Sequence, residues 1–191
     1  MMERYIDESW RNSMRLRLDF NNMMSDQLGN RGIYRRELEV MQPQIDAAIA
    51  SMRAKRPIMR WRELPYNQDE IVASILEEAA RIRDNFDDFV VLGIGGSALG
   101  PTAVQQALNH LRYNDLPRDK RNGPRLFVED NIDPERMAAL LDIVDVEKTC
   151  FNVISKSGGT SETMSQLLII SALLHEKLGA DISTHLVATT D

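Results

Sequence analysis

The sequence predicts an α/β fold, in which three layers are built around a parallel sheet and an N-terminal helical extension precedes them. Two observations indicate this architecture. From Phe89 onward, short apolar runs alternate with helix patterns, which is typical of βαβ units. Before about residue 60 the chain is polar, and its apolar residues recur at helical spacing. A chain of 191 residues is long enough for one such domain with a sizeable core.

The amino-acid composition argues against nucleic acids and membranes as binding partners. Lys and Arg total 23 against 29 acidic residues, for a net charge of -6, and no basic block stands out, so we expect no nucleic-acid binding. No apolar run approaches the length of a membrane span, and the N-terminus carries acids and arginines where a leader would be apolar. We therefore expect a cytoplasmic protein that does not bind a membrane.

Neither a disulfide nor a metal centre is expected. Cys150 is the single cysteine and lies in an apolar run, which favours a small buried hydrophobic residue over a nucleophile. The three histidines, His110, His175 and His185, are scattered without the spacing of metal ligands.

The helical extension is predicted to cover residues 1–66. A long helix is expected at 34–55, where apolar residues recur at helical spacing, and Pro43 is expected to kink or end it. The segment 57–65 is bounded by prolines and is predicted to break the helical pattern.

The core domain is predicted to cover residues 67–191. It opens with a helix at 68–85, whose first turn carries Asp69 and Glu70 where the helix dipole favours negative charge. Beyond this helix, four apolar runs are expected to form a parallel sheet, at 89–94, 125–130, 150–155 and 185–190.

Three helices are predicted between these strands, at 97–112, 133–144 and 160–179. The second begins with Asp133 as its N-cap and Pro134 in the first helical position. The third ends at Gly179, a residue type that suits the C-terminal cap of a helix. The polar stretch 113–124 is expected to be a surface loop.

The loop after the third strand carries the strongest functional pattern. Residues 155–163 read Ser-Lys-Ser-Gly-Gly-Thr-Ser-Glu-Thr and join a strand to a helix start. A helix start offers unpaired backbone N–H groups and the positive end of the helix dipole, and hydroxyl groups add further donors to phosphate oxygens. Helix capping explains one or two of these hydroxyl residues but not all of them. We therefore expect a phosphate site, with Lys156 either neutralising the phosphate or lying in solvent.

A second glycine-rich loop, residues 93–100, follows the first strand. Two such loops at two strand ends suggest one shared pocket. This loop also fits Gly-x-Gly-x-x-Gly/Ala, with Gly93, Gly95 and Ala98, so dinucleotide binding must be considered. The acids at the end of the second strand, Glu129 and Asp130, lie farther along the chain than that fingerprint requires.

Together the two loops resemble the glucose-6-phosphate isomerase family. The strings are Gly93-Ile94-Gly95-Gly96-Ser97-x-Leu99-Gly100-Pro101 and Ser155-Lys156-Ser157-Gly158-x-Thr160-x-Glu162-Thr163, in this order and separated by a strand and a helix. The segment Trp61-Arg62-Glu63-Leu64-Pro65 is similar to bacterial members of the family. The resemblance implies an N-terminal sugar isomerase (SIS) domain with a flavodoxin-like, three-layer parallel sheet.

The resemblance also implies roles for individual residues. Gly96 and Ser97 would line the sugar side of the pocket. Gly159 departs from the family, which commonly has threonine there. The residues that would hold the sugar phosphate are Ser155, Ser157, Thr160 and Thr163, with Lys156 included among the substrate-binding residues.

The family interconverts glucose 6-phosphate and fructose 6-phosphate through an enediol, a reaction that requires no cofactor in principle. By the resemblance, the glutamate base, a histidine, a lysine and a Gly-Gly-Arg motif lie in later sequence, and none of those motifs occurs in residues 1–191. No catalytic residue is therefore assigned to this chain. The sequence ends on an apolar strand that would form an uncovered edge, so we expect a fragment of a longer protein, whose full-length form the resemblance suggests is a homodimer.

Two other interpretations remain open. A stand-alone SIS module that binds or senses a phosphosugar would need no catalytic residues. A nucleotide-dependent oxidoreductase would use the loop at 93–98 as a dinucleotide seat, but that function gives no reason for the hydroxyl residues at 155–163.

Overall fold

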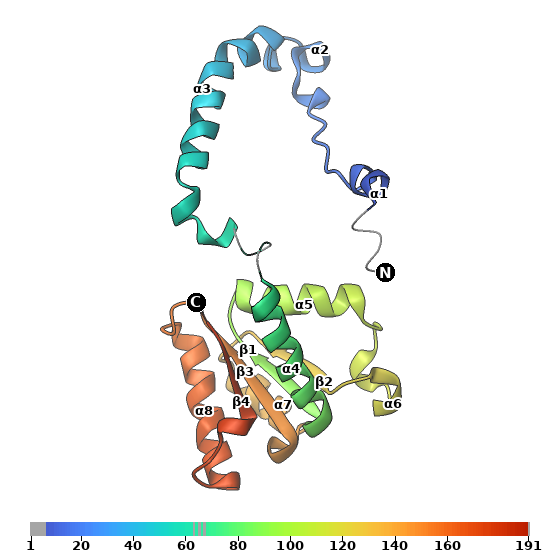
Figure 1. Ribbon diagram of the computed structural model, residues 1–191, viewed down its shortest axis with the longest axis vertical. Helices are drawn as coiled ribbons and strands as arrows, with labels where there is room; N and C mark the ends of the chain where they lie inside the picture. Colours follow the sequence, from blue (N-terminus) through green and yellow to red (C-terminus); the bar gives the residue numbers. More distant parts are fainter. Residues whose placement is uncertain (1–6, 63, 65, 67, 191) are drawn as a thin grey trace. The chain divides into compact units, whose positions relative to one another are not determined.

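The structure, a computed structural model, describes residues 7–62, 64, 66 and 68–190 (Figure 1). The chain divides into two compact units, residues 1–68 and 69–191. Of the segment 61–65, whose sequence is similar to bacterial isomerases, Glu63 and Pro65 lie outside the described residues.

The first unit is helical in the part that is described. Its helices are α1 (Glu8–Ser13), α2 (Ser25–Leu28) and α3 (Arg35–Ala54). Pro43 lies inside α3, which continues to Ala54, so of the two expectations for this proline, a kink or an end of the helix, the second was wrong. Eleven further residues continue the helix past Pro43, and their hydrogen bonds outweigh the single backbone bond that a proline cannot donate.

The second unit is an α/β domain, as predicted. All strand pairs in its sheet are parallel, and the strand order is β2-β1-β3-β4. The elements are α4 (Asp69–Asn85), β1 (Asp88–Leu92), α5 (Gly96–Leu108), α6 (Arg118–Arg121), β2 (Arg125–Glu129), α7 (Pro134–Leu141), β3 (Thr149–Ile154), α8 (Ser161–Leu178) and β4 (Leu186–Thr189).

Helices cover both faces of this sheet. Side chains alternate between the two faces along each strand, so both faces carry apolar side chains that a helix can bury. On one face, Val90, Leu92 and Phe151 pack with buried residues of α7 and α8. On the other face, Cys150 packs with Ile82 and Phe86, and α4 crosses the sheet on this side (Figure 1). Burial raises the pKa of the Cys150 thiol to about 11, so it is a protonated core residue, as its sequence context predicts.

The helix starts and ends follow the expected caps at α7 and α8, although α7 ends at Leu141, three residues earlier than expected. Asp133 caps α7, and Gly179 ends α8 with a φ of 81°, both as predicted. The helix after β1 ends at Leu108, four residues earlier than expected, and the expected loop at 113–124 contains a 3-10 turn at Tyr113–Asp115 and the short helix α6. In this segment Asn114 bonds the backbone of Leu126 through both its amide nitrogen (2.7 Å) and its oxygen (2.8 Å), which orders the chain.

Candidate functional site

The two loops singled out by their sequence lie at the carboxyl edge of the sheet, at the ends of neighbouring strands. β1 and β3 pair directly, with Leu92 opposite Val153. The chain moves from β1 to β2 in one direction across the sheet, and β3 and β4 lie in the other direction. Ligands of open parallel sheets bind outside the carboxyl ends of strands at such a switch point. The candidate site therefore lies where the topology favours one.

Glycine shapes the loop after β1 at two positions. A Cβ atom at Gly93 would lie 2.9 Å from the Cβ of Ser97 and 3.3 Å from the carbonyl oxygen of Ile154, so this position admits no side chain. Gly95 has a φ of 60°, which side chains rarely allow, and it precedes the first residue of α5. Gly96 differs, because a Cβ there would meet nothing within 4 Å. Ser97 is half-buried.

Two hydroxyl groups shape the loop after β3. The N–H of Gly158 donates to Ser155 Oγ (3.1 Å), and the N–H of Gly159 donates to Ser157 Oγ (3.2 Å). Because each serine oxygen accepts in these bonds, its own O–H can still be donated to a ligand. Gly158 has a φ of 65°, whereas a Cβ at Gly159 would meet only Ser157 Oγ at 3.9 Å. The backbone at position 159 therefore leaves room for a Cβ atom.

The remaining predicted residues differ in their exposure. Lys156 is exposed on the loop, and Thr160 is half-buried as the N-cap residue of α8. Thr163, in the first turn of α8, is 1% exposed, and among the described residues its Oγ1 has no hydrogen-bond partner. A buried hydroxyl without a partner is unfavourable for the fold and invites a functional explanation.

The helices that leave the carboxyl edge of the sheet differ in how their N-termini are satisfied. Asp133 caps α7, and its carboxylate accepts from Glu135 N (2.8 Å) and Arg136 N (3.4 Å). At α5 the N-cap is Gly95, which has no side chain, and at α8 the Thr160 side chain makes no cap hydrogen bond. The N-terminus of α8, which follows β3, thus retains N–H groups and a positive dipole end that can receive an anion. At α5, which follows the paired strand β1, the N–H groups of Ser97 and Ala98 already donate to the carbonyls of Ile94 (3.2 Å) and Gly95 (3.1 Å), and the positive dipole end remains.

A buried polar cluster beneath α8 was not found from the sequence. Gln166 is 0% exposed, and its Nε2 donates to the carbonyls of Glu129 (3.2 Å) and Asn131 (3.0 Å). Burial raises the pKa of Glu129, whose Oε2 lies 3.4 Å from Arg136 Nη2 without hydrogen-bond geometry. The sequence feature that could have indicated this cluster is the helical spacing of Gln166 with the apolar residues Ile170 and Leu174, which places the glutamine on the buried side of α8.

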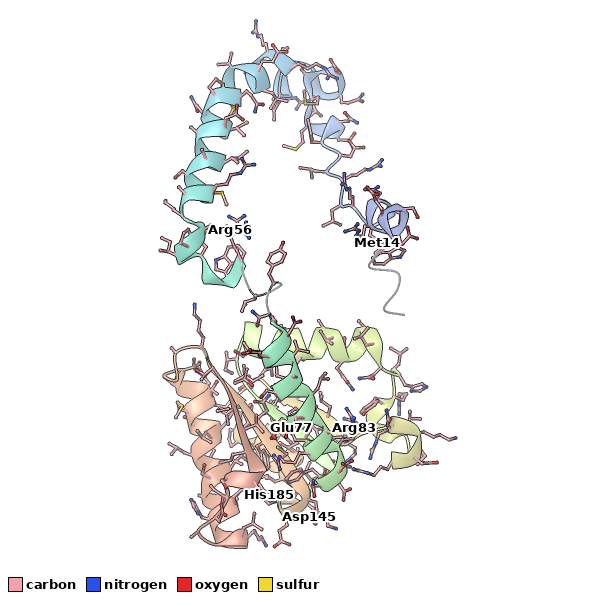
Figure 2. All side chains as sticks on the ribbon, in the orientation of Figure 1. Met14, Arg56, Glu77, Arg83, Asp145 and His185 are labelled. Carbon is pink, nitrogen blue, oxygen red and sulfur yellow. The ribbon has the colours of Figure 1, made fainter. Side chains whose placement is uncertain are left out.

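The histidines and acids form no cluster that could hold a metal ion in the part of the chain that is described. His185, labelled in Figure 2, packs edge-on against Phe86 with ring centroids 5.0 Å apart, and its Nε2 lies 3.1 Å from the carbonyl of Glu147. Among the described residues, no helix is long and apolar enough to cross a membrane.

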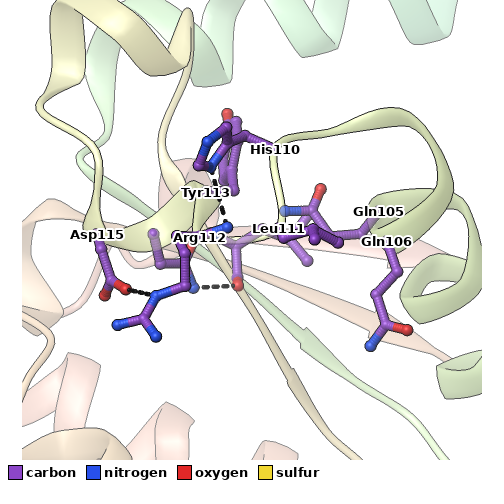
Figure 3. A pocket seen from close by; sticks show the side chains of 9 residues that line it. Gln105, Gln106, His110, Leu111, Arg112, Tyr113 and Asp115 are labelled. Carbon is purple, nitrogen blue, oxygen red and sulfur yellow. Dashed lines mark hydrogen bonds and ion pairs between the residues drawn. The ribbon is translucent and has the colours of Figure 1, made fainter.

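A cavity of about 420 Å³ lies apart from these loops, between the end of α5 and the 3-10 turn at 113–115 (Figure 3). Its polar groups bond one another: Arg112 Nε is 2.6 Å from Asp115 Oδ2, and Arg112 N donates to His110 Nδ1. Leu126, at the second position of β2, lines it, far from the carboxyl end of that strand. We do not assign this cavity to the candidate site.

A sequence model of the family described as phosphoglucose isomerase matches residues 78–191, more than half of the chain. The chain belongs to the phosphoglucose isomerase family. It is 47% identical over 180 residues to the glucose-6-phosphate isomerase of Carboxydothermus hydrogenoformans, covering 93% of this chain. It is 41% identical over 175 residues to that of Rubrobacter xylanophilus, covering 91% of this chain. The chain spans 39% of the length of each of these relatives.

A solved structure agrees with this family assignment at the level of the fold. A hypothetical protein from Thermus thermophilus aligns with a TM-score of 0.66 and 34% sequence identity, over 82% of this chain and 35% of the other. The family resemblance found in the two loops and the α/β fold predicted from the alternating apolar runs and helix patterns are thus both confirmed.

Proposed function

We propose that the loops at 93–97 and 155–163 form the sugar-phosphate site of a glucose-6-phosphate isomerase. The phosphate would lie at the N-terminus of α8, held by backbone N–H groups and by the hydroxyls of Ser155, Ser157, Thr160 and Thr163. Lys156 would add positive charge from the exposed side of the loop. Gly96 and Ser97, at the start of α5, would face the sugar.

The observation that carries this proposal is the contrast in helix capping. The N-terminus of α7 is closed by a carboxylate, whereas the N-termini of α5 and α8 have no side-chain cap. The unpartnered hydroxyl of Thr163 in the first turn of α8 points independently to a missing acceptor or donor. Because Thr163 Oγ1 is buried, its contact with a phosphate requires a local rearrangement around the first turn of α8.

For the whole protein, we propose the interconversion of glucose 6-phosphate and fructose 6-phosphate through an enediol. This proposal is supported by the names of the relatives, which the chain matches over 39% of their length. A carboxylate would move the proton between the sugar carbons, and cationic groups would stabilise the oxyanion. We assign neither role to a residue of this chain. We further propose a cytoplasmic homodimer for the whole protein.

The dinucleotide alternative is disfavoured by the acids at the end of β2. Glu129 is buried on the face of the sheet that α7 and α8 cover, and Asp130 Oδ1 lies 2.7 Å from Arg136 Nη1. Both acids lie within ion-pair distance of Arg136, and Glu129 is also buried, which disfavours a ribose contact at this strand end.

Titration calorimetry of the purified chain tests the proposed site. We expect fructose 6-phosphate and inorganic phosphate to bind competitively and NAD not to bind. Binding of NAD in preference to fructose 6-phosphate would contradict the proposal and favour the oxidoreductase. The stand-alone SIS module is distinguished from the isomerase by activity, since only the isomerase turns the sugar phosphate over.

A further inference from the structure

The buried stripe of α8 changes from polar to apolar along the helix. Its members recur at helical spacing, and Ile170 and Leu174 join the apolar core against Leu92 and Phe151. Toward the N-terminus of α8, where the helix passes the carboxyl ends of the strands, the stripe continues as Thr163 and Gln166. An apolar residue would pack at either position without the desolvation cost of a buried carboxamide or hydroxyl.

Gln166 uses both of its N–H donors on a single region of the backbone. One bond goes to the carbonyl of Glu129, the last residue of β2, and the other to the carbonyl of Asn131, in the loop that begins α7. Its Oε1 has no partner among the described residues. The side chain therefore serves as a donor that ties α8 to the end of β2, at a residue 37 positions earlier in the chain.

The same Glu129 carbonyl also accepts the N–H of Gly93, at 3.2 Å. Gly93 begins the glycine loop that leads into α5, and Gln166 lies in the second turn of α8. One oxygen atom is thus bonded to α8, through Gln166, and to the loop that leads into α5, through Gly93. A displacement of α8 relative to the glycine loop must stretch or break a bond at this atom.

We propose that Gln166 is a positioning residue for the phosphate site, an inference that rests on the proposed function. It fixes the spacing between the N-termini of α5 and α8 without contacting the ligand. A sugar phosphate whose phosphate lies at α8 and whose sugar faces α5 depends on the separation of the two helix ends, because its hydrogen bonds weaken steeply outside their preferred distances and angles.

The test compares Gln166→Met with Ile170→Val on the 191-residue chain. Met keeps the unbranched shape but removes both donors, whereas Ile170→Val lowers packing one turn farther along the same stripe and leaves the donors in place. The probes are inorganic phosphate and fructose 6-phosphate, measured by titration calorimetry. We expect Gln166→Met to bind fructose 6-phosphate about tenfold more weakly, equivalent to about 1.4 kcal/mol, with a smaller loss for inorganic phosphate, which would contact α8 alone. We expect Ile170→Val to bind both as the unmodified chain does.

Amide hydrogen exchange provides a second measurement. If Gln166 only stabilised the fold, its loss would not lower protection selectively in the two loops. In Gln166→Met, protection should fall at Gly93 and across 155–163 more than in the core of the sheet, and in Ile170→Val it should not. Gln166→Asn, which keeps a shorter carboxamide, should lie between the unmodified chain and Gln166→Met in affinity.

Four results of these measurements would contradict the positioning role of Gln166. Unchanged affinity in a folded Gln166→Met variant overturns the positioning role and leaves the proposed function intact. Equal losses of affinity in Gln166→Met and Ile170→Val also overturn it, because stability alone would then explain the effect. If neither Gln166→Met nor Gln166→Asn folds, Gln166 determines the fold and the proposal is wrong. If the unmodified chain binds neither probe, the proposed site itself is wrong and the inference falls with it.

Discussion

Gly93 lies so close to Ser97 that a single added carbon would collide with it. The two Cβ positions would be 2.9 Å apart, and the added atom would also lie 3.3 Å from the carbonyl oxygen of Ile154 at the end of β3. The close approach of the loop after β1 to the end of β3 therefore requires a residue without a side chain at position 93. The first residue of α5, Gly96, has open space around it instead.

This contrast predicts opposite effects for two substitutions. Gly93→Ala should destabilise the chain by about 1–3 kcal/mol through overpacking. Gly96→Val should leave a cooperative melt but weaken binding of fructose 6-phosphate, because its side chain would project into the space proposed for the sugar. Urea unfolding and titration calorimetry of both variants check this. A Gly96→Val chain without a cooperative transition would show that this glycine serves the turn alone.

The difference between capped and uncapped helices predicts a second pair of effects. Asp133→Ala removes an N-cap and should cost about 1 kcal/mol of stability. Thr160→Ala removes no cap bond, so its stability should change little, yet sugar-phosphate affinity should fall by roughly 5- to 150-fold, for 1–3 kcal/mol per bond to a charged group. Thermal melts and calorimetry on the two variants provide the comparison. A large loss of stability in Thr160→Ala with unchanged affinity would instead assign Thr160 to the fold.

Thr163 offers a sharper separation of fold from function. Valine has nearly the same shape as threonine, and the Thr163 hydroxyl has no partner among the described residues. Thr163→Val should therefore keep or increase stability, by up to about 1 kcal/mol, while weakening phosphate binding. Urea unfolding and phosphate titration calorimetry on the same preparation separate the effect on stability from the effect on binding. If stability falls clearly on substitution, the hydroxyl has a structural partner, and its assignment to the phosphate site loses its support.

The fold could be predicted because its signals are local. The apolar runs at 89–94 and 150–155 lie in buried parallel strands, which need no polar alternation. Asp133 and Gly179 mark helix ends by their own backbone chemistry. The positions of the two loops followed from the same local patterns, since the carboxyl ends of neighbouring parallel strands share one edge.

What the sequence did not reveal depends on contacts between distant segments. Gln166 meets the end of β2 only because the sheet places that strand end beneath α8, and a helix pattern alone presents glutamine as a surface residue. The short helix α6 is stabilised partly by Arg118, which bonds the carbonyl of Phe86 at 2.8 Å, 32 residues away. The continuation of α3 through Pro43 likewise depends on the rest of the helix.

Glu129 predicts a dependence of stability on pH. Burial raises the pKa of this carboxyl above the ordinary value of 4.5. At a pH below 4.5, the Glu129 carboxyl is protonated in both the folded and the unfolded state. As the pH rises above it, the unfolded state releases its proton first, so stability falls until the pKa of the folded state has also been passed. The folded protein thus loses stability through Glu129 between the two pKa values.

Glu129→Gln should remove this loss. The stability gained over the unmodified chain should be small at about pH 4 and larger at neutral pH. Arg136 keeps Asp130 as a partner, at 2.7 Å, so the substitution leaves no unpaired cation. Urea unfolding across this pH range measures the effect. A variant that is less stable than the unmodified chain at neutral pH would show that the ion pair with Arg136 outweighs the cost of burial.

The last prediction concerns activity. The 191-residue chain should show no substantial interconversion of glucose 6-phosphate and fructose 6-phosphate, whereas a longer polypeptide that covers the full length of the relatives should. A phosphate site binds the ground state and the transition state almost equally, and uniform binding cannot replace a group that moves a proton between the sugar carbons. Loss of a general base alone commonly costs about 10²- to 10⁴-fold in rate. A coupled assay, with a mock purification as control for host isomerase, measures both polypeptides. Turnover by the short chain near that of the long one would place the catalytic groups among the carboxylates of residues 1–191, and inactivity of both would favour a phosphosugar-binding module.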